Sequence, residues 1–304
     1  MCAYNALSFT REAVGNILGQ TYANIELLIG DDGSTDGTRE WLATLADPRV
    51  RLFLHEENLG YQGNKNFLHS QAKGEFITQQ DCDDTSSLDR IERQYRALRD
   101  GGCKIGGCGY AHIDETGAVT GRVALSQNRV ITTKGENDYP FWFPALMVHR
   151  SVFAEVGLFS DYFAGAFGDD LYWTVRANER FPILCLADVL YGYRHGHGSI
   201  TRLLDNPRKI VMSGVLAELL RQRAETGTDL LEQGRMENLR ALEQNLFRNR
   251  RFRSSQLRAF AARYVDSGEL RAAWTLLARA WTSWPLHSAW YRTAFYWLRQ
   301  TLRR

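Results

Sequence analysis

Three carboxylates lie within four residues in the stretch Asp81-Cys82-Asp83-Asp84, which follows the predicted strand 75–78 after two glutamines. Like charges a few ångströms apart repel one another, so such a cluster is costly unless a cation lies among the acids. Mg²⁺ and Mn²⁺ prefer carboxylate oxygens, and Mg²⁺ usually takes one or two from the protein and the rest from water and phosphates. The stretch is therefore either a clamp for a metal-bound diphosphate or a solvated acidic turn.

Two further acidic pairs occur in the chain. Asp31 and Asp32 come directly after the apolar segment 25–29, and Asp169 and Asp170 begin a helical pattern that runs to residue 179. Acidic side chains are favoured near a helix N-terminus, so each pair has a structural explanation. Each pair also offers carboxylates for hydrogen bonding or proton transfer.

The elements that must position these residues alternate between strands and helices over the first hundred residues. Strands are predicted at 25–29, 50–54 and 75–78, and helices at 38–45, 63–72 and 88–98. This alternation predicts an α/β fold with a parallel, doubly wound sheet. Ligands bind outside the carboxyl ends of the strands in such sheets, which is where both acidic clusters of this region lie.

The pattern changes further along the chain. Residues 114–117 are typical of a hairpin turn, and short helices are predicted at 151–156 and 169–179. Past Asn206 the sequence becomes Arg-rich and helical in pattern, with helices expected at 213–223, 236–246 and 272–281. We therefore predict a catalytic domain over 1–206 and a helical C-terminal module over 207–304.

The composition is that of an ordinary globular protein. The chain has 304 residues, 44% hydrophobic and 24% charged, and its net charge of +2 gives no general attraction to nucleic acid. The five cysteines form no CxxC pair, which is typical of a reducing compartment. No apolar run is long enough to span a membrane. We therefore expect a cytoplasmic protein that works on the cytosolic side.

Several short motifs occur in a fixed order. They are Ala3-Tyr4-Asn5, the stretch 26–38 around Asp31-Asp32-Gly33-Ser34, Asn58-Leu59-Gly60, and the Asp81-x-Asp83-Asp84 loop. This order resembles that of family 2 glycosyltransferases over residues 1–201. The resemblance implies a GT-A fold, with a mainly parallel sheet flanked by helices. It also implies a nucleotide-sugar donor (a UDP-, GDP- or dTDP-sugar), Mg²⁺ or Mn²⁺, and inversion at the anomeric carbon.

The candidates for donor binding are Tyr4, Asp31, Asp32, Lys65 and Asp81. Tyr4 can pack against a base, and a carboxylate at the end of a strand can accept a hydrogen bond from a base or a ribose. In the resembling family the second Asp of the early pair binds the nucleoside, so we favour Asp32 over Asp31. The following helix is expected to be capped by Ser34, Thr35 or Asp36. Lys65 aligns with a basic position of the family, and it either approaches the diphosphate or lies on a solvated helix face.

The metal candidates are Asp83, Asp81 and His197. Asp83 is the preferred direct ligand, whereas Asp81 is a second ligand or acts on the ribose or through water. For Asp84 we favour helix capping over ligation. The stretch 193–201 resembles the late loop of the family, whose His position falls on Gly196, so that His195 and His197 are equally candidates for metal binding and for ordinary surface residues.

An inverting transfer needs a carboxylate that takes the proton of the acceptor hydroxyl. In the resembling family an acidic pair begins a helix, and its base position falls on Asp170. The usual first residue of the pair is Glu, and here it is Asp169, so the assignment between the two stays open. Residues 141–144, which contain Trp142, are expected either to form an aromatic wall for the acceptor sugar or to pack in the core.

The C-terminal segment carries no catalytic constellation. Its helices mix Trp, Tyr, Leu and Phe with Arg, a composition that suits a helical packing module or peripheral contact with an anionic membrane. We favour the packing module over membrane contact, and nucleic-acid binding is a weaker third interpretation.

The sequence as a whole predicts a metal-dependent inverting glycosyltransferase in surface polysaccharide or glycan assembly, with a glycan or lipid-linked acceptor. A homo-oligomer is left open. One alternative is a sugar nucleotidyltransferase, which would need a Gly-rich basic loop that residues 3–10 lack. Another is a donor-binding scaffold subunit without catalysis.

Only Met1 and Cys2 precede the first motif, whereas the first strand of the resembling family carries several apolar residues there. A central strand that is cut short loses ladder hydrogen bonds and buried apolar area. We therefore expect the native chain to start upstream of Met1.

Overall fold

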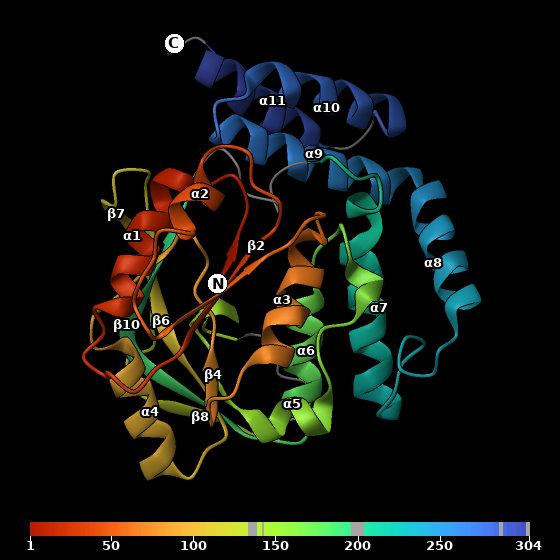
Figure 1. The fold of residues 1–304 in the computed structure, drawn as a ribbon. Helices are drawn as coiled ribbons and strands as arrows, with labels where there is room; N and C mark the ends of the chain where they lie inside the picture. Colours follow the sequence, from red (N-terminus) through yellow and green to blue (C-terminus); the bar gives the residue numbers. More distant parts are fainter. Residues whose placement is uncertain (133–138, 142, 196–203, 286–287, 302–304) are drawn as a thin grey trace. The chain divides into compact units, whose positions relative to one another are not determined.

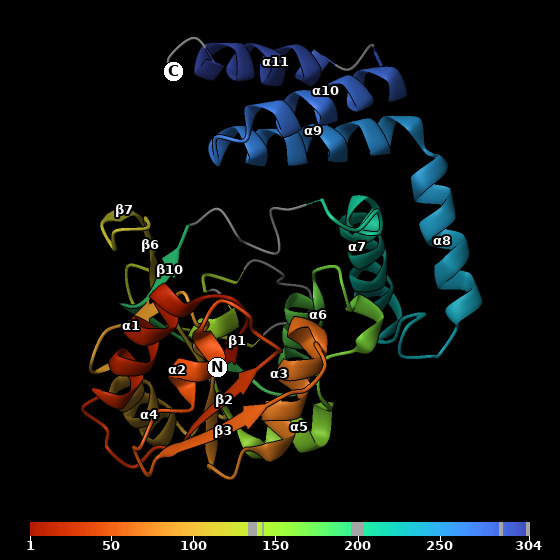
Figure 2. The same cartoon turned by 45° about the horizontal axis from the view of Figure 1, so that its top comes forward.

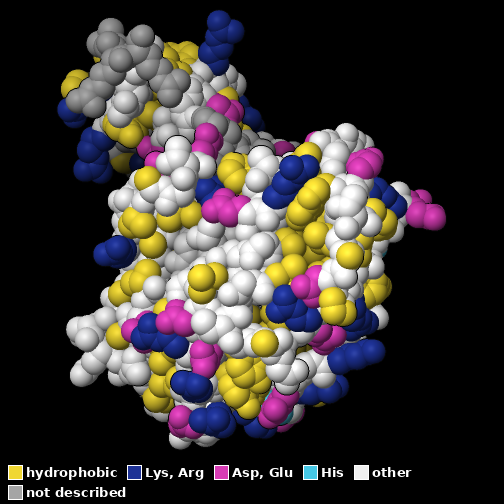
Figure 3. Space-filling view, turned by 60° about the vertical axis from the view of Figure 1, so that its left-hand side comes forward, with side chains coloured by type: hydrophobic (Ala, Val, Ile, Leu, Met, Phe, Trp, Pro, Cys, Tyr) yellow, Lys and Arg dark blue, Asp and Glu magenta, His cyan; other side chains and the backbone are white. Residues whose placement is uncertain are grey.

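The computed structural model describes residues 1–132, 139–141, 143–195, 204–285 and 288–301 (Figure 1). The chain forms two compact units. The first contains Met1–Gly165 and Asp169–His195, and the second contains Ala166–Gly168 and the chain from Gly196 onward. On the face drawn in Figure 3, acidic and basic side chains are interspersed, in keeping with the net charge of +2.

The first unit begins with a small parallel sheet. Its strands are β1 (Cys2–Ala3), β2 (Leu27–Asp31) and β3 (Val50–Leu54), in that order, with β2 in the middle (Figure 2). Cys2 lies opposite Gly30, and Leu27 lies opposite Val50. The predicted strand 25–29 thus begins two residues later and includes Asp31.

Helices cover both faces of this sheet. On one face, α1 (Leu7–Leu18) buries Ala13, Val14 and Ile17 against Ile29 of β2, with α2 (Thr38–Leu42) beside it. Their spacing of three and four residues places these side chains on one side of the helix. On the other face, α3 (Gly60–Gln71) is tied to the sheet by the Asn64 side-chain amide, which donates to the Gly30 carbonyl over 2.8 Å. Figure 1 shows α1 and α3 on opposite sides of β2.

Two predicted helices have different limits in the structure. The helix predicted at 38–45 ends at Leu42, and the one predicted at 63–72 begins earlier, at Gly60. The early start of α3 has a local cause, because the Asn58 side chain accepts the amide of Gly60 over 2.9 Å and Gly60 has a φ of 74°.

The second sheet has seven strands and is mixed. Its main path is β4 (Phe76–Thr78), β9 (Met147–His149), β6 (Ile105–Ile113), β10 (Ile183–Arg194) and β5 (Thr85–Ser86). Two more strands, β7 (Val119–Val123) and β8 (Arg129–Ile131), pair with β6 and β10. β6 and β10 are parallel, and the other pairs are antiparallel.

The predicted α/β class is confirmed, but the parallel arrangement is limited to the first sheet and the β6–β10 pair. The predicted turn at 114–117 shows why the rest is antiparallel. The Asp114 carboxylate accepts the amides of Thr116 and Ala118, and Gly117 has a φ of 87°, so the chain reverses directly from β6 into β7.

Three helices cover this sheet: α4 (Arg90–Gly101), α5 (Arg150–Val156) and α6 (Asp169–Asn178). The core between α5, α6 and the strands contains Ile105, Val148, Val152, Trp173 and Ile183. Phe141 and Phe143 are buried in the same core. Core packing is therefore the correct interpretation for these two rings, and an acceptor wall made from them is wrong. Trp142 lies outside the described residues.

The edges of the two sheets lie along a cavity of about 480 Å³. It is lined by Met1, Leu27 and Leu28 on one side and by Phe76 and Ile77 of β4 on the other. The Met1 ammonium donates to the Leu28 carbonyl over 2.8 Å, and burial lowers its pKa.

The described part of the second unit is helical, which confirms the predicted C-terminal helical extension. It contains α7 (Lys209–Thr226), α8 (Met236–Arg248), α9 (Arg250–Asp266), α10 (Leu270–Ser283) and α11 (Ser288–Thr301). Leu257 and Phe260 of α9 pack against Leu276 and Leu277 of α10, and α11 lies alongside (Figure 2). In the described residues, no helix is both long and apolar enough to cross a membrane.

Candidate active site

Asp31 and Asp32 end β2, but they face different surroundings. Asp31 is fully buried; its Oδ2 accepts the Ser34 amide over 3.2 Å and lies 3.5 Å from Arg39 Nη1. Asp32 accepts the Leu59 amide over 2.7 Å through Oδ1 alone. Asp31 therefore holds its own loop, whereas Asp32 binds the chain before α3 through one oxygen. The nucleoside role of Asp32 stays a prediction.

The loop after β2 is fixed against the chain after β1. The Asn5 side chain accepts the Thr35 amide over 2.8 Å, and Asp36 accepts the amide of Thr38, the first residue of α2, over 3.0 Å. Asp36 is thus the predicted residue that binds the start of α2. Tyr4 stands beside this loop with 54% of its surface exposed, so its ring is available to a base.

In the acidic loop, Asp81 and Asp83 are both partly buried. Asp81 Oδ1 accepts hydrogen bonds from the Tyr61 hydroxyl over 3.2 Å and from Gln79 Nε2 over 2.7 Å. Burial and the negative charge of Asp81 raise the pKa of Asp83 to about 6. The charge of Asp81 therefore destabilises the charged form of Asp83, a situation that a bound cation relieves.

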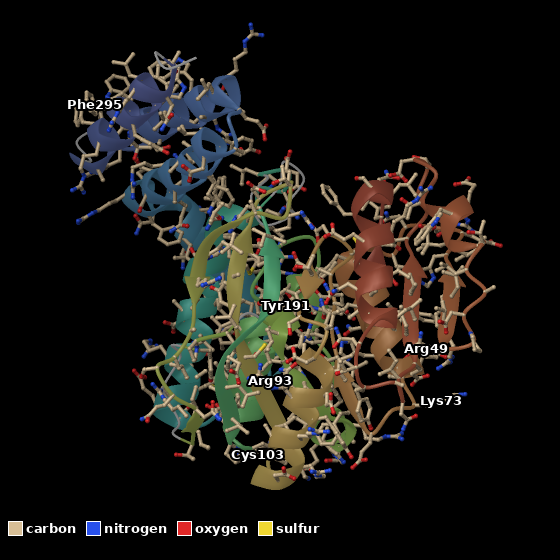
Figure 4. The ribbon with its side chains drawn as sticks, turned by 90° about the vertical axis from the view of Figure 1, so that its left-hand side faces the viewer. Arg49, Lys73, Arg93, Cys103, Tyr191 and Phe295 are labelled. Atoms are coloured by element: carbon tan, nitrogen blue, oxygen red, sulfur yellow. The ribbon has the colours of Figure 1, made fainter. Side chains whose placement is uncertain are left out.

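Asp84 has a different role from the one predicted. It is buried, and its carboxylate accepts the Tyr191 hydroxyl over 2.6 Å and the Arg194 amide over 2.8 Å. The helix-capping prediction is wrong, because β5 follows directly and α4 begins only at Arg90. Asp84 instead ties the acidic loop to β10, in which Tyr191 lies near the middle of the sheet (Figure 4).

The donor set fits a divalent cation held by two carboxylates. Within the ranges that the structure describes, no group of three or more His, Cys, Asp or Glu side chains could hold a metal. Asp81 and Asp83 match the one or two carboxylates that Mg²⁺ usually takes, with phosphate and water completing its shell. The ring of His195 contacts that of His112. His197 lies outside the described residues.

Lys65 lies on α3 and is only 3% exposed, so the solvated helix face is the wrong interpretation of this residue. Its ammonium forms an ion pair with Asp169 and lies 3.8 Å from the centre of the Phe159 ring. A buried Lys of this kind is stabilised by its counterion and by the aromatic face. Contact of Lys65 with a diphosphate stays a prediction.

Asp169 and Asp170 are the first two residues of α6, and the structure distinguishes between them. Asp169 is engaged by Lys65, whereas Asp170 Oδ1 accepts only the neighbouring Leu171 amide, over 2.7 Å. Burial and the charge of Asp169 raise the pKa of Asp170, and Lys65 partly offsets that rise. A carboxylate with a raised pKa is better suited to accept a proton near neutral pH. The role of Asp170 as the base stays a prediction.

Tyr61 connects the two acidic regions and was not predicted from the sequence. Its hydroxyl binds Asp81, and its ring centre lies 5.1 Å from the Lys65 ammonium. Burial and the charge of Asp81 hold the pKa of Tyr61 well above its usual value, so it remains a neutral hydrogen-bond donor. Its position directly after the Asn58-Leu59-Gly60 motif was the only sequence signal.

Arg90 is a second residue that the sequence did not reveal. Its fully buried guanidinium donates to Ser86 Oγ over 2.8 Å and to the carbonyls of Gln79 and Pro144 over 2.9 and 2.8 Å. It also lies 4.8 Å from the centre of the Tyr191 ring. Arg90 therefore binds residues on both sides of the acidic loop and holds its two ends in place.

Acids that follow β2 and β4, with Asp81 after β4 joined through Tyr61 and Lys65 to an acidic pair on α6, are the features of a glycosyltransferase of the GT-A fold. The family model "Glycosyl transferase family 2" matches residues 1–157, and the chain belongs to that family.

Relatives and solved structures agree with this assignment. The chain is 32% identical over 218 residues to the glycosyltransferase GlyG of Streptococcus pneumoniae. This match covers 66% of this chain and 70% of GlyG. It is 37% identical over 94 residues to the Escherichia coli enzyme WfgD, named a UDP-Glc:alpha-D-GlcNAc-diphosphoundecaprenol beta-1,3-glucosyltransferase; this match covers 31% of the chain and 37% of WfgD.

Among solved structures, S. aureus TarS 1–349 superposes with a TM-score of 0.60 at 15% identity, over 86% of this chain and 79% of TarS 1–349. One structure of that protein contains UDP-GlcNAc. At this identity the likeness concerns the fold alone.

Proposed function

We propose that the protein transfers a sugar from a nucleoside diphosphate to an acceptor hydroxyl, with inversion at the anomeric carbon. The observation that carries the proposal is that the two acids at the start of α6 have different surroundings. Asp169 is neutralised by Lys65, and Asp170 beside it has a raised pKa and no ion-pair partner of its own in the contacts described above. The bound UDP-GlcNAc of TarS supports a nucleotide-sugar donor.

In this proposal Asp32 and Tyr4 bind the nucleoside of a UDP-, GDP- or dTDP-sugar. Asp83 and Asp81 hold Mg²⁺ or Mn²⁺, and the cation supplies positive charge to the donor diphosphate and its leaving oxygen. The raised pKa of Asp83 supports this assignment, because two nearby carboxylates lower each other's stability unless a cation is present.

Asp170 takes the proton of the acceptor hydroxyl as that oxygen attacks the anomeric carbon. The bond from the anomeric carbon to the diphosphate oxygen breaks, and the electron pair leaves with the nucleoside diphosphate. Attack on the side opposite the leaving group inverts the configuration. Asp169 and Lys65 position the start of α6 in this scheme, and Lys65 is also a candidate for contact with the donor diphosphate.

The acceptor is a glycan or a lipid-linked glycan of surface polysaccharide assembly, reached from the cytoplasm. The name of WfgD supports this part, since that relative acts on a sugar diphosphate linked to a polyprenol.

The test compares Asp170→Asn and Asp83→Asn with the exposed-residue control Asp100→Asn on α4. Asp170→Asn should bind UDP-sugar with Mn²⁺ as the unchanged protein does, and should lose transfer by about 10²–10⁴-fold. Asp83→Asn should lose the Mn²⁺-dependent part of donor binding, and Asp100→Asn should change neither. Binding is measured by calorimetry, and transfer by release of the nucleoside diphosphate. Full transfer by Asp170→Asn would exclude it as the base.

A further inference from the structure

The C-terminal helices carry an exposed apolar face that the core of the second unit does not use. Trp274 and Trp281 lie seven residues apart on α10, and Tyr291, Phe295 and Leu298 lie at positions i, i+4 and i+7 on α11. Residues at these spacings share one side of a helix. We call these five residues the aromatic face. Phe295 is the most exposed of them, at 68%, and lies on the outer side of α11 (Figure 4).

This face differs from the one that holds the helices together. Trp290 and Trp297 of α11 point toward α10, where their indole N–H groups donate to the carbonyls of Leu277 and Leu270 over 2.7 and 2.8 Å. Both indoles also pack against the core of the unit. Two members of the aromatic face also contact these indoles: the ring centre of Trp274 lies 4.7 Å from that of Trp297, and the ring centre of Tyr291 lies 5.2 Å from that of Trp290. The predicted packing module nevertheless describes only one side of α11.

The charge around the aromatic face is mainly positive, although Asp266 lies nearby and accepts the Tyr296 hydroxyl over 2.8 Å. The chain from residue 270 to residue 304 contains six Arg and neither Asp nor Glu. Four of these arginines lie in the described helices and are exposed: Arg271, Arg279, Arg292 and Arg299. Two copies of such a face would repel each other, which argues against self-association through it.

We propose that the aromatic face binds an anionic phospholipid surface. Aromatic and Leu side chains of an amphipathic helix enter the boundary between headgroups and acyl chains, while arginines beside them contact lipid phosphates. An anionic surface attracts basic residues within a Debye length, and the six arginines of residues 270–304 outnumber the two acids just before them, Asp266 and Glu269. The binding stands independently of the transfer chemistry, and it would bring the enzyme to a lipid-linked acceptor.

Co-sedimentation with vesicles tests the proposal with the full-length protein. It should sediment with vesicles of phosphatidylcholine and phosphatidylglycerol, and remain in solution with phosphatidylcholine alone. Arg292→Gln/Arg299→Gln should lower the partition coefficient by about thirtyfold. The matched control is Arg240→Gln/Arg248→Gln, which removes the same charge from exposed positions on α8 and should sediment as the unchanged protein does.

A second variant, Phe295→Ser, tests the apolar contribution, and should also weaken sedimentation without loss of helix in circular dichroism. The proposal is overturned if the unchanged protein does not sediment with anionic vesicles, or if the α8 control loses as much binding as the α11 variant. It is also overturned if Phe295→Ser only converts a dimer to a monomer in sedimentation velocity. Donor binding, measured on the same samples, reports separately on the proposed function.

Discussion

The buried ion pair between Lys65 and Asp169 offers a quantitative test of how the site is held. The side chains are 3% and 14% exposed. Removing one partner of a buried pair leaves an uncompensated charge and typically costs about 3–5 kcal/mol, whereas replacing both partners is often close to neutral. We expect Lys65→Met to lower the free energy of unfolding by about 3 kcal/mol, and Asp169→Asn by somewhat less because Asp169 is nearer to water.

The double variant Lys65→Met/Asp169→Asn should recover most of the loss, which corresponds to a coupling energy of about 4 kcal/mol between the two sites. Urea unfolding followed by tryptophan fluorescence measures all four proteins. If the losses of the two single variants simply add in the double variant, the ion pair contributes nothing and the reasoning is refuted.

A matched control is the ion pair between Arg93 and Asp188, whose side chains are 43% and 41% exposed. Solvent and salt screen such a pair, so the same cycle there should give a coupling energy below about 1 kcal/mol. Equal coupling energies at the two sites would mean that burial does not set the magnitude.

The same variants have a catalytic readout. Lys65 lowers the pKa of Asp170 and Asp169 raises it. A base must be deprotonated, so activity falls as the pH drops through its pKa. Lys65→Met should therefore move the acidic limb of the kcat profile to higher pH, and Asp169→Asn should move it to lower pH. Shifts in the same direction would contradict the assignment of Asp170 as the base.

Two further predictions concern stability. Burial lowers the pKa of His69 to about 3, so the folded protein keeps this ring neutral while the unfolded chain takes up a proton below about pH 6.5. The stability that depends on this neutral ring is complete above that pH and declines below it, so the free energy of unfolding is lower by about 1.4 kcal/mol at about pH 5.5. His69→Gln should remove this part of the pH dependence of urea unfolding. Gly30→Ala would place a Cβ 2.0 Å from Asn64 Oδ1 and should destabilise by about 1–3 kcal/mol in thermal unfolding. Gly15→Ala, where nothing lies within 4 Å, should leave stability equal or higher; a similar loss at both glycines would contradict the steric explanation.

Strong local periodicity is the part of the fold that the sequence predicts well. The helix at 88–98 was expected from its pattern, and α4 runs over Arg90–Gly101. The antiparallel pairing of β8 and β9 was not expected, because three residues each are too few to show alternation. Their pairing depends on neighbours more than fifteen residues away, which no local pattern encodes.

In the site, too, the residues next to the end of an element were predicted, whereas the roles that depend on distant partners were not. The acids of β2, the loop at 81–84 and α6 were identified because each follows or begins an element. The role of Lys65 was left open, since its partner Asp169 is 104 residues away. Asp84 was misassigned for the same reason, because Tyr191 and Arg194 reach it from a distant strand.

Arg194 gives the acidic loop a further property. Its guanidinium donates to the carbonyls of Asp83 and Asp114 over 2.7 and 3.0 Å and to the Glu12 carboxylate over 2.7 Å, so one side chain joins α1, the loop, the β6–β7 turn and β10. A loop fixed from so many sides has little conformational entropy left to lose when a ligand arrives. Donor association should then proceed in a single kinetic phase whose rate grows linearly with donor concentration, without the plateau that a slow loop rearrangement would impose.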